Sequence, residues 1–124
     1  MFGEDSYCWF NHTTTGICIL DLKGKVESVN DTFEELFGWN RMDVIGRHAN
    51  FLPHVPLVLR FKLNRYLKQV KNDNQSIQYR TIRNRKSGIA IYVDVTLSPL
   101  ILNEITTGYV GEYFFNSVYI PDDK

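Results

Sequence analysis

The sequence predicts an α+β domain in which a five-stranded antiparallel sheet is covered on one face by short helices and one longer helix. Two strand-like segments, residues 16–20 and 25–29, come first and are joined by a turn that contains glycine. Helical patterns fill residues 31–70, and three strand-like segments follow between residues 76 and 115. With 124 residues, the chain is long enough for one hydrophobic core but not for two.

A short lead-in segment, residues 1–15, precedes the expected domain at residues 16–118. The lead-in mixes acidic residues with aromatic ones, including Trp9 and Phe10. We therefore expect a short amphipathic helix that docks its aromatic side chains on the domain. Residues 119–124 are predicted to form a tail or the start of a linker.

Two very short helices are predicted after the first pair of strands. Asn30 or Asp31 can cap the first helix, and Asp31 with Glu34 has the spacing of a capping box. Gly38 supplies a left-handed stop, and Asn40 is the N-cap of the second helix. Helices this short are not stable alone, so they must pack on a larger apolar surface.

A longer helix is predicted from Pro56 to residues 71–74. It carries an apolar stripe at helical spacing, formed by Leu59, Leu63, Tyr66, Leu67 and Val70. Phe61 falls off this stripe, which suggests contact with a second surface.

Three strands are predicted in the last third of the chain, at residues 76–83, 89–98 and 108–115. The second alternates most clearly between apolar and polar residues. Pro99 is expected to end its regular pairing, and residues 103–107 are expected to form a loop.

Composition limits the classes of function. The net charge is zero, with 14 basic and 14 acidic residues, and no nucleic-acid-binding motif occurs, which disfavours a nucleic-acid partner. Two cysteines are too few for a disulfide framework. No run approaches the roughly 20 apolar residues that span a bilayer, so we expect a cytoplasmic domain without direct membrane insertion.

Basic residues gather in the middle of the chain, where Asp73 is the only acid between residues 44 and 93. The basic residues there are Arg47, Arg60, Lys62, Arg65, Lys68, Lys71, Arg80, Arg83, Arg85 and Lys86. They indicate either solvated faces or an electropositive side that meets an anionic ligand or an acidic partner. Arg83 would matter most if it turned inward, because an inward guanidinium demands a carboxylate or phosphate.

Catalytic chemistry is not predicted for this domain. The sequence shows no nucleophile with a base, no paired carboxylates and no glycine-rich phosphate loop. The three histidines, His12, His48 and His54, fall in predicted loops without the ligand spacing of a metal site. We interpret His48 and His54 as surface or loop-packing residues.

A family resemblance rests on residues 29–53, VNDTFEELFGWNRMDVIGRHANFLP. The strand end Val-Asn, then TFEELFGW, then three polar residues before DVIG, resembles the PAS sensory domain, and the flanking strands and helix fit as well. The resemblance implies a sheet with strand order 2-1-5-4-3. It also implies an input domain of a bacterial signalling protein, first a sensor histidine kinase of a two-component system and next a diguanylate cyclase.

The resemblance also allows the cofactors of the family to be checked. Residues 46–53 resemble the flavin-photosensor segment, but the adduct-forming cysteine falls at Ala49. The flavin-contacting residues of that subfamily fall near Arg83, Val93 and Tyr113, and all are changed. Haem-binding members carry a histidine on the long helix, where this chain has none. Flavin and haem are therefore disfavoured, which leaves an unknown small ligand or no ligand.

Two groups of residues are candidates for binding. A pocket between the helices and the inner face of the sheet would be lined by Phe33, Phe37, Phe51, Phe61, Tyr79, Ile91, Val93 and Tyr113. The same residues could instead simply fill the core. An apolar patch on the outer face, which would dock the N-terminal segment or a second subunit, would contain Trp9, Phe10, Ala90, Tyr92, Thr96, Val110 and Phe114.

These observations leave two main functions. One is a sensory input module that binds a small ligand or partner and controls the dimer geometry of a covalently linked output domain. The alternative is a ligand-free protein–protein interaction module that serves dimerisation. The Asp-x-Thr motif that many PAS domains carry after the last strand is absent, and Pro121 opposes direct helical continuation there.

Overall fold

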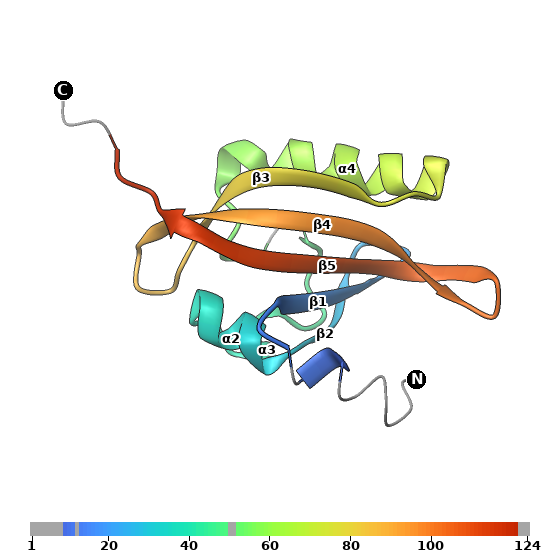
Figure 1. Ribbon diagram of the computed structural model, residues 1–124, viewed down its shortest axis with the longest axis horizontal. Coiled ribbons are helices and arrows are strands. Elements are labelled where there is room, and N and C mark those ends of the chain that lie inside the picture. Colours follow the sequence, from blue (N-terminus) through green and yellow to red (C-terminus); the bar gives the residue numbers. More distant parts are fainter. Residues whose placement is uncertain (1–8, 12, 50–51, 122–124) are drawn as a thin grey trace.

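The computed structural model describes residues 9–11, 13–49 and 52–121, and they form a sheet with helices on one face (Figure 1). The strands are β1 (Gly16–Asp21), β2 (Val26–Val29), β3 (Ile77–Asn84), β4 (Ala90–Leu102) and β5 (Ile105–Val118). The helices between β2 and β3 are α2 (Asp31–Phe37), α3 (Arg41–Val44), the 3-10 turn η2 (Leu57–Leu59) and α4 (Arg60–Asp73).

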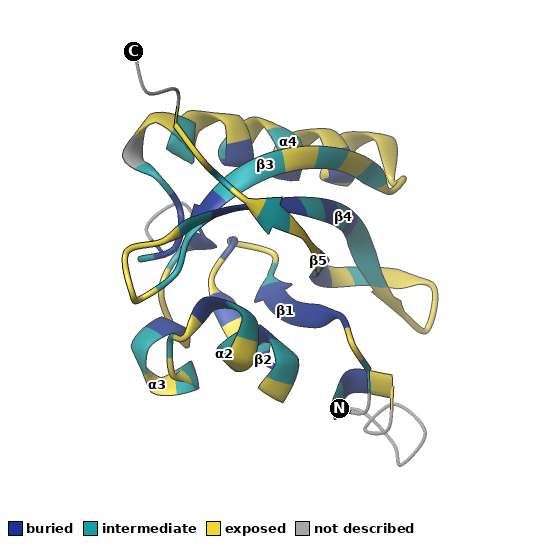
Figure 2. Ribbon diagram, turned by 60° about the vertical axis from the view of Figure 1, so that its left-hand side comes forward, coloured by how far each residue is buried: buried dark blue, intermediate teal, exposed yellow. Residues whose placement is uncertain are grey.

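The five strands are antiparallel and lie in the order β2-β1-β5-β4-β3, which confirms the predicted fold. The register places Val95 opposite Tyr79 of β3 and Tyr113 of β5. Because side chains alternate along a strand, these three residues point to the same face, toward the helices. β1 lies inside the sheet and is buried along almost its whole length (Figure 2).

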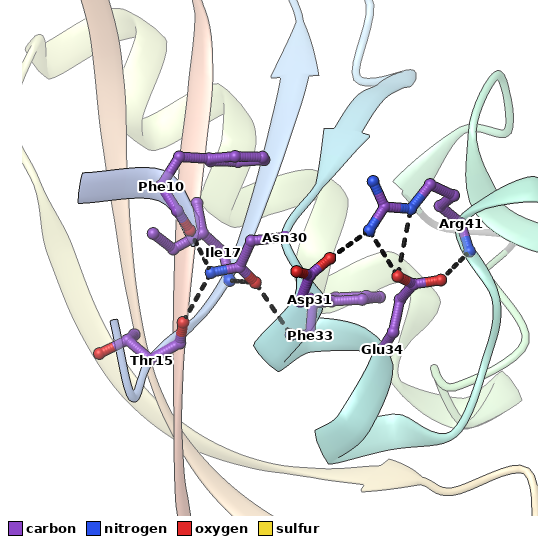
Figure 3. Close-up of polar contacts among 8 residues, drawn as sticks. All are labelled: Phe10, Thr15, Ile17, Asn30, Asp31, Phe33, Glu34 and Arg41. Atoms are coloured by element: carbon purple, nitrogen blue, oxygen red, sulfur yellow. Dashed lines mark hydrogen bonds and ion pairs between the residues drawn. The ribbon is translucent and has the colours of Figure 1, made fainter. Parts of the chain in front are cut away.

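Asn30 organises the start of the helical region (Figure 3). Its side-chain oxygen accepts from the amides of Phe33 and Ile17 at 2.9 and 2.8 Å, so it caps α2 and ties the helix to β1. Its amide group donates to the carbonyls of Phe10 and Thr15. All four hydrogen-bonding positions of this buried side chain are thus used, and its fit explains why Asn30 rather than Asp31 is the N-cap.

The expected capping box between Asp31 and Glu34 does not form. The Glu34 carboxylate instead accepts from the Arg41 backbone amide at 2.8 Å and from the Arg41 guanidinium at 2.6 and 3.1 Å. Asp31 binds the same guanidinium (Figure 3). Arg41 at the start of α3 therefore binds two of the three acidic residues of α2, Asp31 and Glu34, which holds the two short helices together.

The long helix is confirmed, although its first turn is a 3-10 turn, and α4 begins at Arg60 rather than Pro56. Leu63, Leu67 and Val70 are buried against the sheet. Asn74 ends the helix with a left-handed φ of 52°.

Two expectations about β4 and β5 are wrong. Pro99 does not end the strand, because β4 continues to Leu102 and Pro99 pairs with Tyr109. β3 pairs with β4 only as far as Leu97, so Pro99 is bordered by β5 alone, and such an edge position tolerates proline. The expected loop shrinks to a two-residue turn at Asn103 and Glu104, which both adopt the positive φ of a tight hairpin.

The apolar side chains form one main core and a smaller cluster. The main core lies between the helices and the inner face of the sheet. The smaller one lies on the outer face, where Phe10 packs with Ile17, Ile19 and Val110. The lead-in segment therefore covers part of the outer face, as far as the described residues show.

Candidate functional site: buried polar groups in the core

Arg83 is the most unusual residue of the core. It lies on the inner face of β3, opposite Ile91, and is only 2% exposed. Its Nη1 donates to the Thr81 hydroxyl at 3.0 Å and to the Ile82 carbonyl at 2.9 Å. Its Nε has no hydrogen-bond partner among the described residues. The inward orientation that made Arg83 a candidate is therefore observed, and no acidic partner accompanies it in the described part of the chain.

His54 is fully buried in the same core and is surrounded by aromatic rings. Its ring centroid lies 4.6 Å from that of Phe37, 5.3 Å from that of Phe33 and 6.1 Å from that of Tyr113. Neither ring nitrogen finds a hydrogen-bond partner in the described ranges of the chain. Buried imidazole nitrogens usually have partners, so both nitrogens are open to a partner beyond the described residues.

Two tyrosines belong to the same inner surface. Tyr79 stacks on Tyr66 of α4 with ring centroids 4.1 Å apart, and its buried hydroxyl has no partner within the described residues. Tyr113 packs edge-on to Phe33 and Phe37. A buried phenol normally finds an acceptor, so the Tyr79 hydroxyl is a further open hydrogen-bonding group beside those of Arg83 and His54.

The electrostatics of these groups follow from burial and from Arg83. Burial, with the nearby guanidinium of Arg83, holds the pKa of His54 well below its usual value, so the imidazole is neutral at pH 7. Burial raises the pKa of Tyr79 to about 12, and it raises the pKa of Tyr113 as well. The guanidinium of Arg83 is thus the one fixed charge in a set of neutral donors and acceptors.

Most of the predicted pocket residues share the main core. Five of them are buried there: Phe33, Phe37, Ile91, Val93 and Tyr113. Tyr79 packs against that core and is partly buried. Phe61 was predicted wrongly, because it lies on the solvent side of α4 and is 82% exposed. Phe51 lies outside the described residues.

The predicted docking residues are divided between two situations. Phe10 and Val110 are buried in the outer cluster, where they pack within the chain and are not exposed to solvent. Trp9 is 43% exposed and Phe114 is 45% exposed. Ala90, Tyr92 and Thr96 are half-buried. A hollow of about 430 Å³ on this face is lined partly by Thr96 and Phe114.

Sequence reasoning does not reveal that His54 lies near Arg83 in the core. The predicted loop position of His54 is correct, but the sequence of a loop does not indicate whether a residue in it is buried. The inward orientation of Arg83 can be predicted from the sequence. Arg83 is separated from Ile77 and Tyr79 by even numbers of residues, so all three side chains point to the same face of β3.

Comparison with known proteins decides the family. A family model described as the PAS domain matches residues 14–116. The chain belongs to the PAS domain family. A PAS domain is a signal-sensing regulatory module and is itself non-catalytic.

Solved structures share this PAS fold at low sequence identity. A PAS domain from Colwellia psychrerythraea is 20% identical, with a TM-score of 0.78 and coverage of 92% of this chain and 96% of that chain. A PAS domain of a LuxR-family transcriptional regulator from Burkholderia thailandensis, in complex with ethanol, is 19% identical, with a TM-score of 0.70 and coverage of 92% and 97%. The VqmA dimer of Vibrio cholerae is 16% identical, with a TM-score of 0.78 and coverage of 94% and 53%.

Identities this low establish the fold alone. No curated protein sequence matches this PAS domain. Among the described residues, no helix is long and apolar enough to cross a membrane. The part of the chain that the structure describes also holds no group of three His, Cys, Asp or Glu side chains placed to bind a metal ion.

Proposed function

We propose that this PAS domain is the sensory input module of a cytoplasmic bacterial signalling protein and that it binds a small ligand between the helices and the inner face of the sheet. The observation that carries the proposal is the set of buried polar groups without partners: the nitrogens of His54, the hydroxyl of Tyr79 and Nε of Arg83. Leaving such groups unpaired costs about 1–3 kcal/mol each, so a ligand that pairs them gains affinity. The ethanol complex of the Burkholderia thailandensis PAS domain supports small-molecule binding within this fold.

Ligand occupancy would act on a linked output domain by changing the geometry of a homodimer. Support comes from the Vibrio cholerae VqmA structure, which is described as a dimer with a large conformational shift. A sensor histidine kinase is the output that the family resemblance favours, with a diguanylate cyclase next.

We also propose that this PAS domain works without flavin or haem. Ala49 supplies no thiol to form a flavin adduct, and α4 contains no histidine to bind haem iron. A purified protein with visible absorption bands would contradict this part of the proposal.

The test is to purify the domain under native conditions and to identify bound small molecules by mass spectrometry after denaturation. The identified compound is then added back during thermal unfolding. We expect it to raise the midpoint of the wild type and of the exposed control variant Gln78→Ala, but not that of Tyr79→Phe with His54→Phe. An empty domain whose stability responds to no extracted metabolite would contradict ligand sensing.

A ligand-free interaction module is the second candidate, and the outer face favours it. Phe114 exposes a large aromatic surface on the strand next to the half-buried Tyr92 and Thr96, and Trp9 exposes a second aromatic surface beside Phe10. Sedimentation of the wild type and of Phe114→Ser tests this candidate. A concentration-dependent dimer that Phe114→Ser dissociates, in a domain whose stability responds to no extracted metabolite, supports it, and a monomer at all concentrations contradicts it.

A further inference from the structure

The charge of Arg83 is unbalanced inside the core. Both hydrogen bonds of its Nη1 go to neutral oxygens, those of Thr81 and Ile82. The ion pairs found within the described residues join Arg41 to Asp31 and Glu34, and Arg80 to Asp94, and all of them are at least partly exposed and involve neither Arg83 nor His54. A buried charge is normally paired, because low dielectric surroundings make an isolated charge far more costly than an isolated neutral group.

The neighbouring groups are suited to an acceptor of hydrogen bonds. His54 is neutral and can donate from one ring nitrogen, and the Tyr79 hydroxyl can donate as well. The register brings Tyr79 and Arg83 to the same face of β3, four residues apart. His54 is held close to this strand, since its backbone carbonyl accepts from the amide of Asn84 at 2.7 Å. One cation and two neutral donors therefore converge from β3 and the segment before α4.

We propose that the ligand of this PAS domain is a small organic monoanion whose carboxylate pairs with Arg83. The inference rests on the proposed ligand-binding function and adds the chemical class of the ligand. A guanidinium presents parallel N–H donors that match the two oxygens of a carboxylate. Nε of Arg83, which has no partner among the described residues, is one of those donors.

The rest of the core decides between a carboxylate and a phosphate. The walls around His54 are the rings of Phe33, Phe37 and Tyr113, which suit an apolar or aromatic body. A phosphate ester would bring a second negative charge and more acceptor oxygens into the same place. The described residues of this core offer no second cation, so one charge of a dianion would stay unpaired.

Ligand entry must move the His54 ring, which now packs within 4.6 Å of the Phe37 ring, measured between centroids. Packed interiors have little free volume, so an added molecule displaces a side chain rather than filling a gap. Movement of His54 would shift the segment that leads into η2 and α4. Binding of the carboxylate at Arg83 is thereby coupled to the position of the long helix.

The test compares carboxylates with amides of the same shape on three proteins: the wild type, Arg83→Met and Arg80→Met. Arg80 lies on the same strand but is exposed on the outer face, so Arg80→Met removes the same charge without touching the core. The probes are formate, acetate, benzoate and phenylacetate with their amides, at constant ionic strength. Thermal unfolding and amide NMR shifts report binding.

We expect at least one carboxylate to bind the wild type and Arg80→Met, and its amide to bind neither. Affinity for Arg83→Met should fall roughly tenfold to hundredfold, the effect of losing a charge-assisted pair. Arg83→Lys, which keeps the charge but not the planar fork, should lose less. It replaces Arg83→Met if that variant does not fold.

The contrary outcomes separate the two proposals. Equal binding of amides and carboxylates, or carboxylate binding that Arg83→Met leaves unchanged, overturns the carboxylate assignment and leaves the ligand-binding function standing. Failure of every probe to bind the folded wild type also overturns the assignment. The ligand-binding function then depends on the mass spectrometry of native ligands alone, and fails separately if that finds an empty domain.

Discussion

The backbone carbonyl of His54 accepts a 2.7 Å hydrogen bond from the backbone amide of Asn84, the residue that follows Arg83. This contact joins the segment before α4 to the end of β3 and brings two buried basic side chains into one core. Buried polar groups usually have a full set of hydrogen-bond partners. Among the described residues of this PAS domain, neither the neutral imidazole nor the charged guanidinium has such a set.

Replacement of Arg83 by methionine should stabilise the domain in the absence of ligand. The substitution removes an unpaired buried charge at the cost of two hydrogen bonds to neutral oxygens. We expect the free energy of unfolding in urea to rise by about 1–2 kcal/mol. A decrease would show that Arg83 has a favourable partner in the folded protein, and Arg80→Met provides the surface control.

The stability of the domain should fall as the pH drops below about 6.5, because of His54. Above that value, the imidazole is neutral in both the folded and the unfolded chain and contributes no pH dependence. Below it, the unfolded chain takes up a proton, while the folded chain cannot, because the pKa of His54 is lowered by burial and by Arg83. The loss should approach about 1.4 kcal/mol per pH unit until the folded-state pKa is reached.

Urea unfolding between about pH 8 and pH 5 tests the role of His54. His54→Phe should remove most of the slope in this range, since phenylalanine does not titrate and suits the surrounding rings. His48→Gln, which changes a partly exposed histidine, should keep it. An unchanged slope in His54→Phe would contradict the assignment.

Asn30→Ala should be among the most destabilising single substitutions in the described part of the chain. Asn30 caps α2 and also satisfies the carbonyls of Phe10 and Thr15 in a buried place. We expect a loss of about 2–4 kcal/mol in the free energy of unfolding, from the cap and the unpaired groups together. Asn72→Ala, on the exposed side of α4, should cause no loss.

The pairing of Glu34 with Arg41 predicts a second, more acidic pH effect. Hydrogen bonds from the Arg41 side chain hold the pKa of Glu34 below its usual value of 4.5. The resulting stability is present above about pH 4.5 and is lost as the pH falls through the folded-state pKa. This window lies below that of His54, so the two effects are separable.

Glu34→Gln should cost about 0.5–1 kcal/mol at neutral pH, a modest amount because the pair is partly exposed. It should also flatten the stability curve below about pH 4.5. Salt should weaken the pair in the wild type but not in Glu34→Gln. Glu35→Gln, at an exposed position of the same helix, is the matched control and should change neither property.

Local patterns in the sequence predicted most of the fold. An N-cap at Asn30 or Asp31 and a left-handed stop at Gly38 are local signals and are confirmed, and the contacts of Asn30 with Phe10, Thr15 and Ile17 select Asn30 as the cap. The sequence pattern underestimates the lengths of β4 and β5, because it treats Pro99 as the end of the regular pairing. β4 accommodates Pro99 because β3 pairs with β4 only as far as Leu97. That condition involves residues far apart in the chain and is invisible to a local pattern.

The sequence by itself determined the α+β class and the order of the strands and helices along the chain, because periodicity and capping are properties of neighbouring residues. It also carried the resemblance that the PAS family model bears out. Only the tertiary structure decided that Phe61 faces solvent and that His54 and Arg83 share one core. The reason is physical. Burial and the pairing of charges depend on which distant segments come together, and here the sheet register and the hydrogen bond between His54 and Asn84 bring them together.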